Sequence, residues 1–294
     1  MAVSDAVLGF LGVQALRAAR LFPLHASTNF GSALMRTVGP WLREQRIGRE
    51  NLAAAYPDKS AAEIDEILDG VWDNLGRVGA EFAHIDRLWD FRPGAPGRIM
   101  ESAESERRVL RLRDDGKPAI VFAAHLANWE LAAVAAASYG LDSTVLYRRP
   151  NNRAISDEVL EQRARCMGTL VPTNIEAPMA LVEALQHGSH VAILVDQHYT
   201  RGVPVKFFGR RALANPLIPW LLRKVDCPLH GIRVVRHPGD RFQLDLTEAI
   251  PVPRDAKGRV DMQGTMQAIT DVVEGWVREH PEQWLWLHRR WRDN

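Results

Sequence analysis

Cysteine is scarce in this chain of 294 residues, which contains only Cys166 and Cys227. Two cysteines so far apart match neither a zinc knuckle nor the disulfide framework of a small secreted domain. We therefore expect both to be free thiols in a reducing compartment.

An excess of charge of one sign is also lacking, because 37 lysines and arginines are balanced by 36 aspartates and glutamates, for a formal net charge of +1. A dedicated nucleic-acid-binding protein usually carries a basic excess, so no nucleic-acid partner is expected and any basic surface must be local. The chain also has no GxSxG elbow, no P-loop and no GxGxxG segment, which removes support for several other enzyme classes.

A hydrophobic run long enough to cross a membrane is missing near the N-terminus. The uncharged, mostly apolar stretch 6–16 would extend about 16 Å as a helix, whereas the hydrocarbon core of a bilayer is about 30 Å thick. The early Asp5 and the lack of a small-residue cleavage site argue against a secretory signal. Arg17 and Arg20 follow, so two interpretations stay open: an interfacial helix with arginines at the headgroups, or a helix packed on the core.

The most informative segment is 118–140, which has the pattern of a strand, a tight turn and a helix. Residues 119–124 are apolar and uncharged, and residues 127–138 are rich in alanine. His125 is therefore expected at the carboxyl end of a strand, where open α/β sheets place their ligand sites. Asn128 is a candidate cap for the helix that follows.

A histidine at that edge can act as a general base if a carboxylate holds its second ring nitrogen. Glu130 follows five residues later, and a fully helical step of that length turns about 140° away. The two side chains can therefore meet only if His125 lies before the first helical turn. The pattern H-x-x-x-x-E is short, so the alternative is a structural histidine with Glu130 on a solvated helix.

The sequence around this pair, HLANWE, and the segment PEQWLWLHRRW near the C-terminus resemble the late acyltransferases of lipid A biosynthesis. These are the lauroyl and myristoyl transferases of the wider lysophospholipid acyltransferase superfamily. Further blocks follow in the family's order: NLAAAYP, residues 74–81, YRRPNN, LVDQ and VKFFGRRA. The resemblance covers most of the chain and implies that His125 and Glu130 are catalytic.

The resemblance also implies the reaction, which is transfer of a fatty acyl chain from acyl carrier protein to a hydroxyl of a lipid A precursor. The expected location is the cytoplasmic face of the inner membrane, with peripheral or weak attachment to the membrane surface. Because a thioester is already activated, a base and an oxyanion stabiliser suffice, and no metal or organic cofactor is expected.

Two more predicted strands lead polar residues to the same sheet edge. Residues 143–147 precede Arg149, whose planar guanidinium is a candidate clamp for an anionic substrate group. Residues 190–195 precede Asp196, a candidate for supporting His125, holding a substrate hydroxyl or capping the next loop.

Residues 198–215 are expected to form a long loop, and loops of this length are usually functional or mobile. Arg210 and Arg211 lie beside Phe207 and Phe208, a combination that suits an acyl chain next to an anionic headgroup or an acidic carrier protein. Two buried phenylalanines under a solvated basic rim would produce the same pattern. The predicted catalytic residues are His125, Glu130 and Asp196, and the predicted substrate-binding residues are Asn128, Arg149, Gln197, Arg210 and Arg211.

The order of predicted elements indicates an α/β fold with a central mixed, mostly parallel sheet flanked by helices and preceded by an N-terminal helical extension. We expect residues 1–95 to form a membrane-associating helical segment and residues 96–294 an α/β acyltransferase core, integrated in one domain. Residues 60–84 are expected to form a helix that begins at a capping box of Ser60 and Glu63. Residues 262–279 are predicted to form the last helix.

Tryptophans at positions 284, 286 and 291 lie among arginines in the C-terminal tail. They suit an interfacial belt, a lid over the cleft, or packing beneath an arginine-covered surface. Two alternative functions also stay open. One is acylation of another glycolipid, such as phosphatidylinositol mannoside, and the other is a peripheral protein that binds anionic lipid without catalysis.

Overall fold

The computed structural model describes residues 2–292, so the outer limits of the two predicted segments, residues 1 and 294, lie outside the described part. Within these residues, seven strands form one sheet in the order β1-β9-β8-β2-β5-β3-β4, and β8–β9 is the one antiparallel pair. The prediction of a mixed, mostly parallel sheet is confirmed. The strands are β1 (Ile99–Glu101), β2 (Ile120–Ala123), β3 (Ser143–Tyr147), β4 (Thr169–Pro172), β5 (His190–Leu194), β8 (Leu229–His237) and β9 (Arg241–Leu246).

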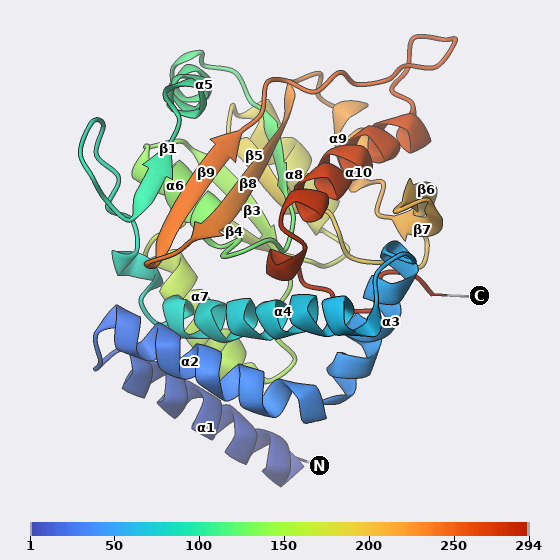
Figure 1. Cartoon of the computed structure of the whole chain (residues 1–294). Helices are drawn as coiled ribbons and strands as arrows, with labels where there is room; N and C mark the ends of the chain where they lie inside the picture. The colour runs from blue at the N-terminus through green and yellow to red at the C-terminus, as the bar shows by residue number, and fades with distance from the viewer. Residues whose placement is uncertain (1, 293–294) are drawn as a thin grey trace.

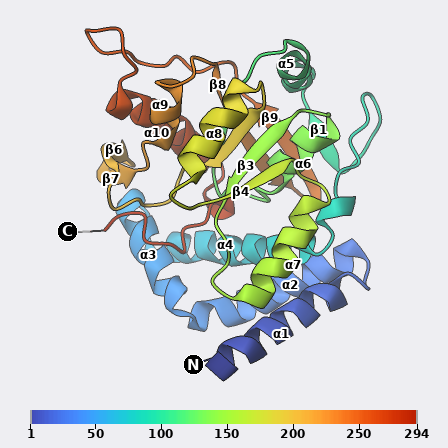
Figure 2. The ribbon, with the colours of Figure 1, turned by 180° about the vertical axis from the view of Figure 1, so that it is seen from behind.

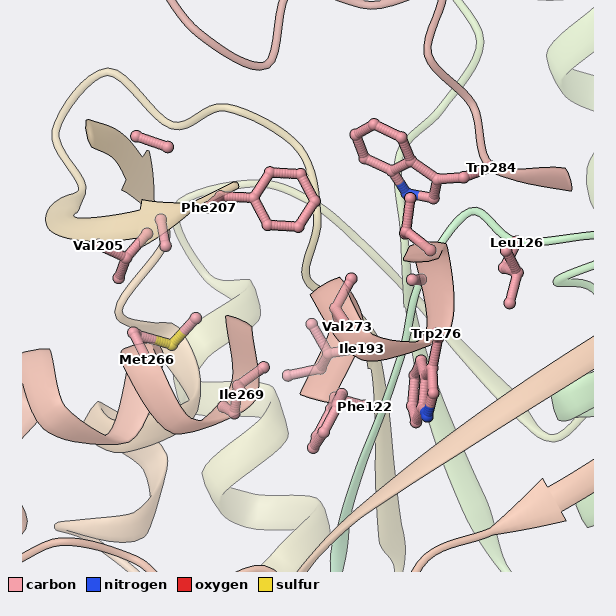
Figure 3. Packing of buried hydrophobic residues seen from close by; sticks show 14 of the residues in the cluster. Phe122, Leu126, Ile193, Val205, Phe207, Met266, Ile269, Val273, Trp276 and Trp284 are labelled. Carbon is pink, nitrogen blue, oxygen red and sulfur yellow. The ribbon is translucent and has the colours of Figure 1, made fainter. Parts of the chain in front are cut away.

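One side of the sheet packs on helices α8 (Ala177–Gln186), α9 (Leu217–Leu222) and α10 (Met262–Glu279). Side chains alternate along a strand, so Phe122 of β2 and Ile193 of β5 both face this layer. Figure 3 shows Phe122 beside Trp276 of α10, with ring centroids 5.8 Å apart. The predicted helix 262–279 is confirmed at both ends.

The other side of the sheet is covered by α5 (Ala103–Asp114) and α6 (Leu131–Ser138). The residues that β2 and β5 present there are small or medium-sized, among them Val121, Ala123 and Ala192, and they are only half-buried. This layer is therefore packed less tightly than the α10 side.

Four helices precede the sheet: α1 (Ala2–Ala19), α2 (Leu24–Val38), α3 (Arg43–Ala55) and α4 (Ala61–Phe82). Ser60 caps α4 in a capping box with Glu63, as predicted, and Pro23 separates α1 from α2. Figure 1 shows α4 beneath the sheet, with α2 and α1 on its outer side. Seen from behind, α1 also lies beside α7 (Arg153–Ala164) (Figure 2).

The two arginines at the end of α1 bind protein carboxylates. Arg17 pairs with Glu158 of α7 at 2.8 Å, and Arg20 pairs with Asp86 at 2.6 Å. Both ion pairs hold this end of α1 against the rest of the protein, while the Arg17 side chain stays 61% exposed. None of the helices within residues 2–292 is both long and apolar enough to cross a membrane.

The segment 198–215 is not one long loop, and that prediction is wrong. It contains an antiparallel hairpin of β6 (Val203–Phe207) and β7 (Arg210–Ala214). Val205 and Phe207 point inward while Lys206 is exposed, which is the two-residue period of a half-buried strand. Phe207 and Phe208 are both buried, so they cannot offer an exposed aromatic surface to an acyl chain.

Candidate active site

The sheet register brings His125 and Asp196 together. Ala123, the last residue of β2, is paired with Leu194, the last residue of β5, so the residues two positions further on emerge side by side. Nδ1 of His125 lies 2.7 Å from Oδ1 of Asp196. The main-chain N–H of His125 and the indole N–H of Trp284 both donate to Oδ2 of Asp196, each at 2.7 Å.

These contacts shift the pKa of both members of the pair. Burial alone would raise the pKa of Asp196, but the charge of His125 and the hydrogen bonds from it outweigh burial and hold that pKa well below its ordinary value. Burial alone would lower the pKa of His125, and the Asp196 carboxylate outweighs it, so the pKa of the imidazole is raised above 6.5. Asp196 is thus ionised, and Nδ1 carries a proton toward it.

This arrangement leaves Nε2 of His125 as the nitrogen available for chemistry. The side-chain amide of Gln197, which is exposed, lies 3.4 Å from Nε2. The ring of Trp129 lies on another side of the imidazole, with centroids 5.0 Å apart. A base with one nitrogen held by a carboxylate and the other open to a cavity has the geometry needed to remove a proton from a substrate.

Glu130 does not hold the imidazole, which differs from the sequence expectation. Its carboxylate accepts bonds from Arg163 of α7 at 2.5 and 2.9 Å and from the indole of Trp129 at 3.1 Å. Helix α6 begins only at Leu131, so the segment between His125 and Glu130 is a turn that directs the carboxylate toward α7. Glu130 still contributes to raising the pKa of His125 through its charge, after the larger effects of burial and Asp196.

The turn after His125 is held by the C-terminal tail. Ala127 adopts φ +46°, in the left-handed region that a residue with a side chain seldom occupies. Its N–H donates to the carbonyl of Gln283 at 2.9 Å, and its carbonyl accepts from Asn74 of α4 at 3.3 Å. Trp284 in this tail is fully buried. The tail is therefore packed structure and forms neither a lid nor a membrane belt.

A buried ion pair between Glu81 and Arg236 supports the same turn. Asn128 is fully buried, donates to Glu81 of α4 at 2.9 Å and accepts from the N–H of Glu130 at 3.2 Å. Glu81 in turn pairs with Arg236 of β8 through both guanidinium Nη groups. Asn128 therefore supports the turn. This differs from the substrate-binding role expected from the sequence.

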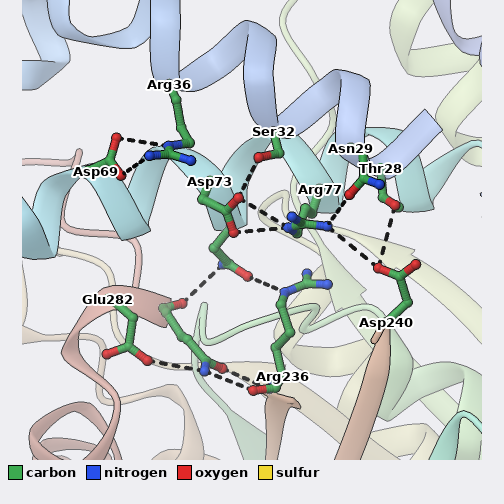
Figure 4. A network of polar contacts seen from close by, with 12 residues as sticks. Thr28, Asn29, Ser32, Arg36, Asp69, Asp73, Arg77, Arg236, Asp240 and Glu282 are labelled. Atoms are coloured by element: carbon green, nitrogen blue, oxygen red, sulfur yellow. Dashed lines mark hydrogen bonds and ion pairs between the residues drawn. The ribbon is translucent and has the colours of Figure 1, made fainter. Parts of the chain in front are cut away.

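Figure 4 shows how Arg236 extends this support. Arg236 donates to Asn74 of α4 at 2.9 Å. The same region of α4 is tied to α2, because Asp73 accepts from Ser32 and Arg77 donates to Asn29. Arg77 also reaches Asp240 in the turn between β8 and β9, at 3.6 Å. Polar contacts thus join the N-terminal helices to the sheet around the turn that follows His125.

A cavity of about 570 Å³ is lined by His125, by strands of the sheet and by helices α5 and α6. Gln197 and Tyr199 line it near His125 and are exposed, so we take this end as its mouth. The walls are mostly aliphatic and rich in alanine, from both strands and helices: Val121, Ala123, Ala132, Ala133, Ala136, Val145, Ala192 and Leu194. Such a cavity fits a slender apolar group whose reactive end lies at the histidine.

The remaining predicted site residues, Arg149, Arg210 and Arg211, are not among the residues that line the cavity. Arg149 is exposed at the carboxyl end of β3, where its Nε lies 3.4 Å from the hydroxyl of Tyr147. Arg210 of β7 stacks on Trp291, with its guanidinium carbon 5.1 Å from the ring centroid. Arg211 is exposed on the hairpin, paired in register with Lys206.

Sequence reasoning did not single out Trp129, Arg163 and Trp284 individually. Arg163 is the ion-pair partner of Glu130, and Trp284 is a hydrogen-bond donor to Asp196. The only sequence signal for the tryptophans was their position inside the blocks HLANWE and PEQWLWLHRRW. Arg163 lies in a helix that the sequence analysis did not predict, so nothing pointed to it.

Comparison with known proteins gives one family. The family model for bacterial lipid A biosynthesis acyltransferases matches residues 2–293. The chain is 23% identical over 269 residues to the lipid A biosynthesis palmitoleoyltransferase of Escherichia coli (strain K12), covering 89% of this chain and 83% of that protein. It is equally similar to a lipid A biosynthesis acyltransferase of Shigella flexneri. The chain therefore belongs to the bacterial lipid A biosynthesis acyltransferase family and is an acyltransferase of lipid A biosynthesis.

Proposed function

We propose that this acyltransferase moves a fatty acyl chain from an acyl carrier protein thioester to a hydroxyl of a lipid A precursor, with Nε2 of His125 as the general base. The observation that carries the proposal is the His125–Asp196 pair, 2.7 Å apart, at the mouth of an apolar cavity. The cavity accounts for a fatty chain, and the pair accounts for activation of a hydroxyl.

In this reaction the acceptor hydroxyl oxygen attacks the thioester carbonyl while Nε2 of His125 takes its proton. The negative charge of Asp196 stabilises the imidazolium that results. As the tetrahedral intermediate collapses, the C–S bond breaks, an ester forms, and the imidazolium returns the proton to the departing thiolate. The amide of Gln197, beside Nε2, is a candidate donor to the oxyanion.

Exposed basic residues outside the cavity suit the two charged substrates. Acyl carrier proteins are acidic, and the exposed Lys206 and Arg211 of the β6–β7 hairpin form a small basic surface. Tyr199 and Asn215, which flank that hairpin, line the cavity, so a carrier docked there would lie next to the entrance. Arg149, at the edge of β3, is assigned to an acceptor phosphate.

Attachment to the inner membrane is assigned to the N-terminal helices. Large apolar side chains are exposed on α1, on the link between α1 and α2, on α2, and on and directly after the 3₁₀ turn Gly39–Trp41. These residues are Phe10, Leu11, Leu21, Phe22, Phe30, Leu34, Val38, Trp41 and Leu42. Because α4 lies under the carboxyl edge of the sheet with α2 outside it, lipid bound here would be on the same side as His125 (Figure 1).

Membrane fractionation tests this attachment. Alkaline carbonate should release the protein, and exchange of Phe30 and Trp41 for serine should lower the bound fraction before extraction. Resistance of the wild-type protein to carbonate would instead indicate an integral anchor.

A reconstituted transfer assay tests the proposed reaction. Purified protein is supplied with acyl carrier protein loaded with different fatty acids, palmitoleate included, and with either a lipid A precursor or a phosphatidylinositol mannoside. Mass spectrometry should show a new ester on the lipid A precursor. The mass of lipid A from cells that lack and then regain the protein should change by the same acyl group. Transfer only to the mannoside would overturn the proposed acceptor.

A further inference from the structure

The cavity changes character at its inner end. Its lining extends from His125, at the carboxyl edge of the parallel strands, to the buried Ser143 and His190 at the opposite edge. These two residues begin β3 and β5 and are paired in register. Four strand steps separate His190 from Leu194, or about 13 Å. The aliphatic section lies between the two edges.

Two polar atoms at this end have no partner among the described residues. They are Oγ of Ser143 and Nδ1 of His190. Ser143 is 3% exposed and His190 is 6% exposed, and both line the cavity. A buried polar atom without a partner is costly, so its presence on a cavity wall indicates that something other than hydrocarbon belongs there.

The unpartnered ring nitrogen of His190 limits what that partner can be. Burial lowers the pKa of His190, so the imidazole is neutral. In a neutral imidazole, Nδ1 either accepts or donates a hydrogen bond, according to the tautomer. Water or a hydroxyl group can both donate and accept, so either one satisfies Nδ1 in both tautomers, whereas a hydrocarbon chain satisfies it in neither.

Other polar groups at the same end add to this character. Glu101 ends β1, which runs opposite to β2, so its carboxylate also lies at the inner edge. It accepts from the hydroxyl of Tyr139 at 2.9 Å, and burial raises its pKa to about 7. Ser105 of α5 lines the cavity there as well.

We propose that this polar end, and not a steric wall, sets the longest acyl chain that the enzyme accepts. The inference rests on the proposed acyl transfer. A chain that ends within the aliphatic section leaves the polar atoms hydrated. A longer chain pushes its methyl end against Ser143 and His190, displaces their water and offers no hydrogen bond in return.

The test compares acyl carrier protein donors of increasing chain length with the wild-type enzyme and His190→Leu, which has a similar size but no polar atom. For the first chain length that the wild type rejects, His190→Leu should raise kcat/KM by about tenfold, the value expected for one unsatisfied buried group. Shorter donors should react as before. Ser143→Ala, a smaller change, should shift the profile in the same direction and serves if His190→Leu folds poorly.

Two controls separate polarity from space. A rejected long chain that carries a terminal hydroxyl should be accepted by the wild type, because the hydroxyl can form a hydrogen bond with Nδ1 in either tautomer. It should lose that advantage over the plain chain in His190→Leu. Thr144→Val removes a hydroxyl from the same strand outside the cavity, where Oγ1 is bonded to Ser189, and should leave the profile unchanged.

The inference is overturned if the wild type transfers acyl chains but the dependence of kcat/KM on chain length is unchanged in both cavity variants. It is also overturned if the terminal hydroxyl gives no benefit. Failure of the wild type to transfer any acyl chain overturns the proposed function instead.

Discussion

Asp196 is fixed by three donors, and one of them is the ring that it orients. Oδ1 contacts Nδ1 of His125 at 2.7 Å, while Oδ2 accepts the main-chain N–H of the same residue and the indole of Trp284. The donors come from two distant segments of the chain, the turn after β2 and the C-terminal tail. The direction of the imidazole is thus built into the fold.

Replacement of Asp196 by asparagine should lower kcat by about 10²-fold or more, because the amide cannot stabilise the imidazolium and can select the wrong tautomer. Glu130→Gln should cost at least about tenfold less, since Glu130 pairs with Arg163 and does not contact the ring. Steady-state kinetics on the two variants show which substitution lowers kcat more. A larger loss in Glu130→Gln would make Glu130 the group that orients the imidazole.

The pH dependence of kcat/KM should report the raised pKa of His125. The base must be unprotonated, so activity should fall as the pH drops through that pKa, with a midpoint above 6.5. In Asp196→Asn the carboxylate is lost while burial, which lowers the pKa, remains. The midpoint should therefore move to lower pH. A midpoint that stays constant or rises in this variant would contradict the assigned electrostatics.

The Glu81–Arg236 pair should be important for stability because Glu81 is fully buried. Glu81→Ala leaves a buried guanidinium uncompensated and removes the acceptor of Asn128, so the free energy of unfolding should fall by about 3–5 kcal/mol. Asp226→Asn removes the partner of Arg254 in an exposed pair and should change the free energy of unfolding by less than about 1 kcal/mol. Denaturant unfolding of both variants makes the comparison, and equal losses would contradict it.

Arg211 and Arg149 should affect different kinetic parameters. Arg211→Ala on the hairpin should raise KM for the acyl carrier protein and flatten its salt dependence, because long-range attraction is screened by salt. Arg149→Ala should lower turnover as well as acceptor affinity if it positions an acceptor phosphate. Each substrate is varied at low and high salt. A change confined to donor KM in Arg149→Ala would reassign that residue to the carrier protein.

Local patterns predicted most of the regular elements. The capping box at Ser60, the alternation and length of the central strands and the periodicity of α10 are all encoded within a few residues. Strand β1 has only three residues, and β4 has four residues none of which is fully buried, so neither has the apolar run that marked β2. The β6–β7 hairpin was missed because the exposed charges of alternate positions resembled a basic loop.

The composition of the site was easier to predict than its connections. His125 and Asp196 could each be assigned to a strand end, but their contact depends on β2 and β5 being neighbours in register, although β3 and β4 lie between them in sequence. Glu130 was favoured as the partner because it is close along the chain. Distance in sequence is a poor guide when the sheet order brings a residue from 71 positions away into contact.

Acyl transfer by His125→Ala tests the role of His125 as the general base most directly. It is measured with purified enzyme, acyl carrier protein donor and lipid A precursor. Circular dichroism and thermal unfolding should first show that the variant is folded like the wild type. We predict that its kcat falls by about 10²- to 10⁴-fold, the contribution typical of a general base. Turnover near the wild-type value in the folded variant would contradict the assignment of His125 as the catalytic base.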